Sequence, residues 1–455
     1  MAAANRPEPH PPPPPAEPLP WPVRLYLAAL LIPLALDLGP LVLSGLRLLL
    51  LALVLPLLLA LLRGRFGRLL PADLLMLAHL GWATLALLLN NAGRGVEYAG
   101  ASGVEILGGY LLARAYIRSA AAFVALLKSL AALLTLTLPA ALFEALAGQP
   151  IVLTLLARLP GFHLALAPAE AGQRLGLFRA QVVFAHPIHY GLFAALVCTL
   201  CLVGLRGLWP APMRLALAAG AGLAVLLSLS SGALLALALQ LGLIAWAWLL
   251  RATPRRWLIL LGLAALAYLA LDLGASRSPY RVFLSYATFN PATAYWRALT
   301  LDWGLVNIGR HPLFGLGLND WARPAFMISP SVDNFWLLTA MRYGLPGFLT
   351  LVLGLLWALL RIGRRDLDAD PWLWQLRRAW MIAWVGLGFA LATVDVWAAI
   401  QSFVFFLFGA GLWFTDAGPA AAPASAGLAR RLPPRPTPAP LPFTRFGPTG
   451  PAPGA

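Results

Sequence analysis

An Asp-Asn pair stands directly before an apolar run in residues 330–348, PSVDNFWLLTAMRYGLPGF. Either Asp333 or Asn334 could cap a helix by accepting backbone N–H bonds, which is typically worth about 1 kcal/mol. Asp333 could also act as a general base, because an ionisable group at the mouth of a membrane bundle is a functional candidate. The pair alone leaves both roles open. Asp395, another acid between apolar runs, is an alternative base and a better candidate as the partner of an arginine.

Arginines gather in two long polar stretches, at about 147–184 and 274–334. The guanidinium group is planar and permanently charged, so its fork suits phosphate and carboxylate groups. Such a cluster could bind an anionic head group, or it could form salt bridges within the loops and contact lipid phosphates. The residues are Arg158, Arg174 and Arg179 in the first stretch, and Arg277, Arg281, Arg297, Arg310 and Arg323 in the second.

The second stretch predicts a helix that carries Arg297. It begins at Pro291 after Asn290, a good N-cap, and it ends by Arg310 because the residue before Pro312 avoids the α region. The aromatic residues on this helix favour a position on the membrane surface, with Arg297 presented to the mouth of the bundle. Gly315 and Gly317 follow and predict a tight turn.

Two histidines, His186 and His189, stand three residues apart at the start of an apolar run. Their spacing would suit a metal pair, but no carboxylate nearby in the sequence completes a site, so we predict no metal. Both remain candidates for substrate binding at the bundle mouth. Cys198 and Cys201 form a CxxC inside the same apolar run, where packing is a better interpretation than redox chemistry.

The elements that position these residues are membrane helices. The chain has 455 residues, 60% of them hydrophobic and 11% charged. We therefore predict an all-α, polytopic transmembrane bundle of about twelve spans. The predicted spans lie near 23–38, 44–62, 71–90, 103–119, 121–146, 185–205, 213–228, 231–250, 256–273, 335–360, 377–394 and 397–415.

The arginines outside the two long stretches predict the orientation. With the N-terminus in the cytoplasm, every connection that follows an even-numbered span and leads into the next carries at least two arginines, as the positive-inside rule requires. The outer connections at 228–231 and 395–397 carry none. Both termini are thus predicted to be cytoplasmic, and the two long loops lie outside. These arginines are scattered over short connections and are not gathered on one face. Their distribution therefore argues against nucleic-acid binding as the reason for the net charge of +16.

Both ends of the chain are rich in proline. We predict disordered cytoplasmic tails at 1–20 and 417–455, and a transmembrane domain at 21–416. No cleavable signal peptide is predicted, because the N-terminus is polar.

The segments RHPLFGLGLNDW and SVDNFWLLTAMRYGLPGF together resemble the O-antigen ligase and polymerase superfamily of bacterial membrane glycosyltransferases. The family pattern is an Arg-bearing periplasmic helix, an hPlfGxG segment, a His-Asn pair that opens a span, and a Gly-x-x-Gly. RAQVVFAHPIHYG is similar to its upstream Arg-containing segment. The matching residues are Arg179, Arg297, Pro312, Gly315, Gly317, Asn334, Gly344 and Gly347. The likeness spans about 20–415.

Two positions depart from the family pattern. Asp333 stands where the family has histidine, which puts a histidine-based mechanism in doubt. Ser230-Ser231-Gly232 stands where many members have Ser-Arg-Gly, which removes one possible phosphate contact.

The resemblance implies a GT-C-like enzyme of the bacterial inner membrane. It would transfer a glycan from undecaprenyl diphosphate to a sugar hydroxyl on the periplasmic face, without a metal, a nucleotide or another cofactor. Arg179 and Arg297 would stabilise the leaving diphosphate, and Asp333 would act as the base. Further substrate-binding candidates are Asn334, Arg174, His186, His189, Arg281, Arg310, Gly315 and Gly317. Arg342 would pair with an acid or line the donor path.

We favour a polymerase of O-antigen or exopolysaccharide repeat units over a ligase that moves the finished glycan to a lipid A-core or another acceptor. The expected partners are the lipid-linked glycan and membrane lipids, with a chain-length regulator as a further candidate and no nucleic acid. A polysaccharide-lipid flippase is the alternative of another class. It would predict internal repeats, with broken helices at corresponding positions of two halves, and the sequence shows no such repeat.

Overall fold

The computed structural model describes residues 13–38, 41–166, 172–274, 278–287 and 291–418. Most of both predicted tails, residues 1–12 and 419–455, lies outside the described residues, as does Arg277.

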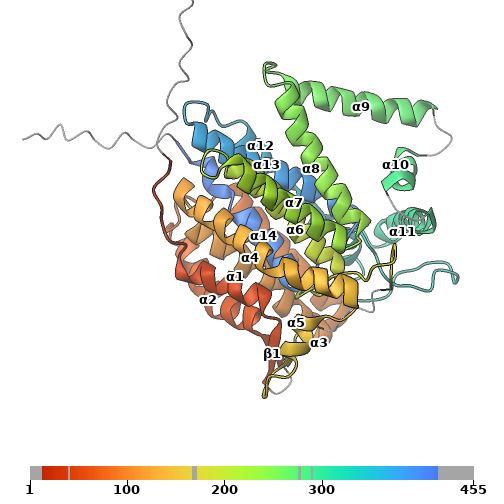
Figure 1. Ribbon diagram of the computed structural model, residues 1–455. Coiled ribbons are helices and arrows are strands. Elements are labelled where there is room, and N and C mark those ends of the chain that lie inside the picture. The colour runs from red at the N-terminus through yellow and green to blue at the C-terminus, as the bar shows by residue number, and fades with distance from the viewer. Residues whose placement is uncertain (1–12, 39–40, 167–171, 275–277, 288–290, 419–455) are drawn as a thin grey trace, which may run out of the picture. The chain divides into compact units, whose positions relative to one another are not determined.

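The described chain is a helical bundle (Figure 1). Its helices are α1 (Trp21–Leu31), α2 (Gly45–Leu62), α3 (Pro71–Tyr116), α4 (Ala120–Ala147), α5 (Ile151–Leu156), α6 (Pro187–Gly204), α7 (Ala211–Leu227), α8 (Ser231–Leu249), α9 (Arg256–Gly274), α10 (Pro279–Ala287), α11 (Pro291–Arg310), α12 (Phe335–Gly363), α13 (Pro371–Ala390), α14 (Ala398–Gly409) and a 3₁₀ helix, η1 (Leu412–Thr415). The predicted helical class is confirmed.

Among the described residues, eight helical segments are long and apolar enough to cross a membrane. They are α2, α3, α4, α6, α8, α9, α12 and the segment from α14 through η1. The other predicted spans fall on α1, α7, α13 and the second half of α3. The protein is therefore an integral membrane protein by the composition of its helices, while the total of twelve spans stays a prediction.

Helix α3 doubles back on itself. Its backbone leaves the helical region at Asn91, where φ is −145° and ψ is 40°. Asp73 near its start and Arg114 near its end nevertheless lie together, with Arg114 Nε 3.4 Å from the Asp73 carboxylate. The two halves are therefore antiparallel, which matches the two predicted spans. The residues between the two predicted spans are helical apart from Asn91.

A small antiparallel sheet corrects two predictions. β1 (Leu34–Leu38) pairs with β2 (Leu41–Ser44) and with β3 (His163–Leu164). The first predicted span, 23–38, is therefore too long, because α1 ends at Leu31. Pro33 explains the end, since the residue before a proline is pushed out of the α region and Ile32 has ψ 87°. The fold is thus helical with a three-stranded sheet rather than purely α.

The bundle core lies around α6 and α14. In α6, 83% of the residues are buried inside the protein, and in the segment from α14 through η1 the share is 89%. Cys198 and Cys201 are among them, both buried and unbridged, as the packing interpretation predicted. Helix α9 is the opposite case, because none of its residues is buried.

Candidate functional site

The start of α12 separates the two roles considered for the Asp-Asn pair. Asn334 is the N-cap, and its side-chain oxygen accepts the backbone N–H of Leu337 at 3.0 Å. Within the described part of the chain, no backbone N–H donates a bond of this kind to Asp333. Its carboxylate accepts a hydrogen bond from the Ser331 hydroxyl at 2.8 Å and is exposed. The acid is therefore available for chemistry while its neighbour begins the helix.

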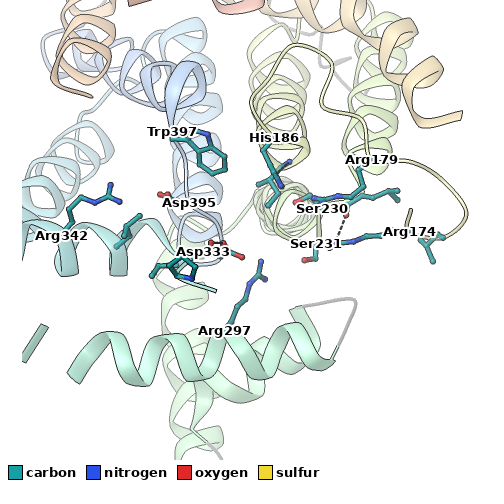
Figure 2. A pocket seen from close by; sticks show the side chains of 17 residues that line it. Arg174, Arg179, His186, Ser230, Ser231, Arg297, Asp333, Arg342, Asp395 and Trp397 are labelled. Carbon is teal, nitrogen blue, oxygen red and sulfur yellow. Dashed lines mark hydrogen bonds between the residues drawn. The ribbon is translucent and has the colours of Figure 1, made fainter. Parts of the chain in front are cut away.

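Arg297 reaches the same place from α11. The predicted helix and its end are confirmed, since α11 runs from Pro291 to Arg310. The helix packs closely on α12, because a Cβ on Gly304 would lie 2.8 Å from the Leu337 side chain. Burial lowers the pKa of Arg297, and Asp333 opposes that shift. Its Nε atom is buried without a hydrogen-bond partner in the described structure. Figure 2 shows Arg297 reaching from α11 toward Asp333.

Two arginines of the first long loop are held at the turn between α7 and α8. Arg174 donates to the carbonyl of Leu229 at 3.0 Å, and Arg179 donates to the carbonyl of Ser228 at 3.4 Å. Burial and the nearby Arg174 lower the pKa of Arg179 to about 10, so it stays charged at neutral pH. These bonds use only part of each guanidinium fork, which leaves N–H groups for an anion.

The same turn begins α8. The Ser230 hydroxyl caps that helix by accepting the N–H of Ala233 at 3.3 Å, and Ser231 is its first residue. A helix N-terminus carries partial positive charge and suits anions. Arg174 and Arg179 therefore supply positive charge at the turn that carries Ser230 and Ser231.

These groups line one cavity of about 850 Å³. Figure 2 shows Arg174 and Arg179 beside the two serines, and Arg297 with Asp333 facing them. Its polar lining residues are Arg174, Arg179, His186, Ser230, Ser231, Arg297, Ser331, Asp333, Arg342 and Asp395. We call this the central cavity. It brings together residues from both long loops that are far apart in sequence.

His186 faces the central cavity as a neutral donor. It is the N-cap of α6, where its Nδ1 accepts the N–H of Ile188 at 3.2 Å. Burial and Arg179 lower its pKa to about 4. In the neutral ring with Nδ1 as acceptor, Nε2 carries the proton. His186 is thus arranged to donate a hydrogen bond rather than to take a proton.

His189 does not line the central cavity. It is buried in α6, one turn behind His186, with its ring edge-on to Trp397 at 4.1 Å between ring centroids.

Asp395 and Arg342 form the inner wall of the central cavity. The sequence predicted Asp395 only as an alternative base or the partner of an arginine, and Arg342 only as the partner of an acid or a residue of the donor path. Arg342 donates to the Tyr98 hydroxyl at 2.5 Å and lies over the Tyr98 ring. Burial raises the pKa of Asp395 to about 6, Arg342 opposes the shift, and Asp333 adds to it. The only sequence signal was the position of Asp395 at the predicted outer end of two spans.

Two smaller cavities adjoin the central one. The outer cavity, of about 340 Å³, shares Arg297, Ser331 and Asp333 with it and is lined by the aromatic rings of Tyr280, Trp296 and Phe326. The inner cavity, of about 320 Å³, shares Leu338, Arg342, Asp395 and Trp397 and continues beside α3. Asp333 and Arg297 therefore lie where the central and outer cavities meet.

Several predicted site residues lie elsewhere. Arg281 pairs with Asp302 at an exposed position, and Arg310 is exposed at the end of α11. Asn334 lines the outer cavity only.

Gly315 and Gly317 form the predicted turn, each with φ +62°. They pack against the backbone of α12 and against Asn91 of α3. The structure therefore gives them a role in placing the site, with no place in its lining.

Backbone strain is concentrated around the central cavity. Among the described residues, four that are not glycine have a positive φ: Leu175, Val182, Leu229 and Ala398. Leu175 and Leu229 line the central cavity, and Ala398 follows Trp397, which also lines it. Such conformations cost of order 1–3 kcal/mol and persist where the surrounding structure holds them, commonly at functional sites.

Residues 215–352 match the family model described as O-antigen ligase. The matched segment covers less than a third of the chain, and its similarity supports the resemblance to the O-antigen ligase and polymerase superfamily. It includes Ser230, Arg297, Asp333 and Arg342, while Arg174, Arg179, His186 and Asp395 lie outside it. No curated protein matches the chain.

Proposed function

We propose that the protein is a polymerase that joins oligosaccharide repeat units carried on a polyprenyl diphosphate. The observation that carries the proposal is the central cavity, where four arginines and two carboxylates from separate segments meet. The O-antigen ligase family match supports lipid-linked glycans as the substrate class. The reaction would take place on the periplasmic face of the bacterial inner membrane, where the predicted orientation puts both long loops.

The arginine side of the cavity fits the leaving group. When the glycosidic bond to the diphosphate breaks, negative charge develops on the diphosphate oxygens, and fixed positive charge stabilises it. Arg174, Arg179 and the start of α8 lie on one wall, and Arg297 faces them. The neutral His186 would add a hydrogen bond to the same group.

The acceptor hydroxyl needs a base, and Asp333 is our assignment. It lies at the junction with the outer cavity, whose aromatic rings suit the apolar faces of a sugar. Asp333 would take the hydroxyl proton as the new C–O bond forms and the bond to the diphosphate breaks. With one displacement and one base, the anomeric centre inverts. Asp395 is the alternative base, although its position beside Arg342 favours a role in charge balance.

A ligase is the second candidate, because the matching family model is described as O-antigen ligase. Both reactions would use the same leaving group and differ in the acceptor. A flippase fits less well, because it has no use for a base at the junction of two cavities.

The test uses the purified protein and a lipid-linked repeat unit. A polymerase would convert the unit into a ladder of longer lipid-linked glycans and release polyprenyl diphosphate, with no other acceptor present. A ligase would need an added acceptor, such as a lipid A-core, before it released any. Release of neither product with any acceptor would contradict the proposal of a glycosyltransferase.

A further inference from the structure

A further cavity, which we call the second cavity, lies at the end of α12 that is far from the central, outer and inner cavities. It has a volume of about 560 Å³ and is formed by α8, α9, α12 and α13. Leu338 and Arg342 of α12 line the central cavity, whereas Leu359, Leu360 and Gly363 line this one. Helix α12 is interrupted at Gly344, and its unbroken part from Leu345 to Leu359 is about 22 Å long. The two cavities therefore lie toward opposite ends of this helix, which the predicted orientation places at opposite membrane faces.

The walls of this second cavity combine apolar side chains with arginines. Arg256 of α9 and Arg377 and Arg378 of α13 line it, together with a single acid, Asp368. That acid is exposed and lies 3.9 Å from Arg377. The other lining residues are mostly leucine and aromatic, such as Leu260 and the tryptophans. The cavity is thus positively charged at one edge and apolar elsewhere.

Two of these arginines each have an Nε atom without a hydrogen-bond partner in the described structure. They are Arg256 and Arg378, and both Nε atoms are buried. Arg378 lies over the Trp374 ring, with its guanidinium carbon 5.3 Å from the ring centroid, and Arg256 donates to the Arg251 carbonyl at 3.2 Å. The positive-inside rule explains why arginines occur at this face. It does not explain why the Nε atoms of two arginines that line an apolar cavity are buried without a partner.

Helix α9 leaves the cavity open on one side. None of its residues is buried, and it extends away from the other helices (Figure 1). Its apolar side chains are therefore available to lipid along its length. A ligand in the second cavity would have its acyl chain on α9 and its head group at the arginines.

We propose that this second cavity binds an anionic membrane phospholipid, with the head-group phosphate on Arg256 and Arg378 and an acyl chain along α9. Basic pockets between membrane helices suit such head groups, and planar guanidinium forks suit phosphate oxygens. The site is separate from the central cavity and does not depend on the proposed reaction.

The test measures which lipids stay bound to the purified full-length protein. The detergent-solubilised protein is stripped of lipid and titrated with phosphatidylglycerol or with phosphatidylcholine of the same acyl chains, and occupancy is read by native mass spectrometry. We expect at least a tenfold preference for phosphatidylglycerol. Arg256→Gln combined with Arg378→Gln should abolish the preference. Arg255→Gln, an exposed neighbour outside the cavity lining, should keep it.

A second variant keeps every charge and therefore guards against misfolding of the first. Leu260→Trp fills the apolar part of the cavity and should lower the occupancy of phosphatidylglycerol at least tenfold. Equal retention of the two lipids by the unmodified protein would overturn the proposal, as would an unchanged preference in the double arginine variant. Displacement by inorganic phosphate alone would reveal a simple anion site, and stronger binding of undecaprenyl phosphate would reveal a carrier site; either also overturns it.

Discussion

At the scale of single residues, the Asp-Asn pair at the start of α12 divides two tasks between neighbours. Asn334 caps the helix, and Asp333 points toward Arg297 at the junction of two cavities. The sequence could offer both roles for the pair, because either side chain can accept a backbone N–H. Only the geometry shows which of the two is used for the cap.

The first prediction separates these tasks by mutation. Asp333→Asn should reduce glycan transfer by at least about a hundredfold, because the base is lost while the shape is kept. Asn334→Ala should lower the stability of the protein by about 1 kcal/mol through the lost cap. Thermal unfolding and transfer rate measured together distinguish the two. A stable Asp333→Asn protein with normal activity would show that Asp333 is not the base.

The second prediction compares two arginines of one helix. Arg297→Ala should lower the transfer rate by about 10²–10³, the cost of removing a group that stabilises developing charge. Arg310→Ala is the matched control, because Arg310 is exposed at the end of the same helix and lines none of the three cavities. Its rate should stay near that of the unmodified protein. Equal losses in both variants would contradict the assignment of Arg297.

The third prediction concerns pH. Burial raises the pKa of Asp395 to about 6, so its carboxylate is ionised at neutral pH and becomes protonated below that value. If the negative charge beside Arg342 is needed, the rate should fall about tenfold per pH unit below pH 6. The pKa values of His186, about 4, and Arg179, about 10, lie outside this window.

Asp395→Asn tests that assignment. Its rate should be low and independent of pH between about 5 and 7, because the titrating group is gone. A fall below pH 6 that persists in the variant would assign the titration to another group.

At the scale of elements, tight turns fix the start of α12 against α3. Gly317 has φ +62°, and a Cβ there would lie 2.1 Å from the side-chain oxygen of Asn91. That same oxygen accepts the N–H of Leu318 at 2.6 Å. Gly344 has φ +73°, and next to it Leu345 donates to the carbonyl of Pro312 at 2.7 Å. The glycine-containing turn is thus joined to both α3 and α12 beside the site.

The fourth prediction tests this coupling. Gly317→Ala should destabilise the protein by about 1–3 kcal/mol and reduce transfer, although Gly317 does not line the central cavity. Gly309→Ala is the control, because Gly309 is helical and a Cβ there meets nothing within 4 Å. It should be neutral or slightly stabilising. The denaturation midpoints of the two variants provide the comparison.

Local signals explain which elements could be predicted. The Pro291 start and the Pro312 stop lie next to the helix they delimit, so α11 was predicted with its observed bounds. Pro33 carried the same kind of signal, but the apolar residues around it hid the end of α1. The two spans within α3 were predicted, but the break at Asn91 depends on contacts of that residue with residues far along the chain, which no local pattern contains.

At the scale of the whole molecule, the site exists because distant segments meet. Arg174 and Arg179 are held at the α7–α8 turn, whereas Arg297 and Asp333 come from the second long loop. The sequence could show that both loops are rich in arginine, and the family resemblance pointed to Arg179 and Arg297. It could not show the hydrogen bonds to the turn, because those depend on tertiary structure.

The fifth prediction tests the orientation of the bundle. In a protein with Cys198→Ala and Cys201→Ala, a single Ser329→Cys should react with an impermeant maleimide added to spheroplasts. Arg364→Cys, at the far end of α12, should react only after the membrane is opened. Labelling in the reverse order would contradict the predicted cytoplasmic termini.

The most direct test of the central claim follows lipid-linked intermediates in a strain that lacks the protein. Complementation with the unmodified chain should restore a ladder of long glycans on the carrier. Arg297→Ala and Asp333→Asn, present at normal membrane levels, should leave single repeat units on the lipid. Normal ladders in either variant would contradict the role of that residue. Full-length glycan that stays on the carrier in the deletion strain would identify a ligase in place of a polymerase.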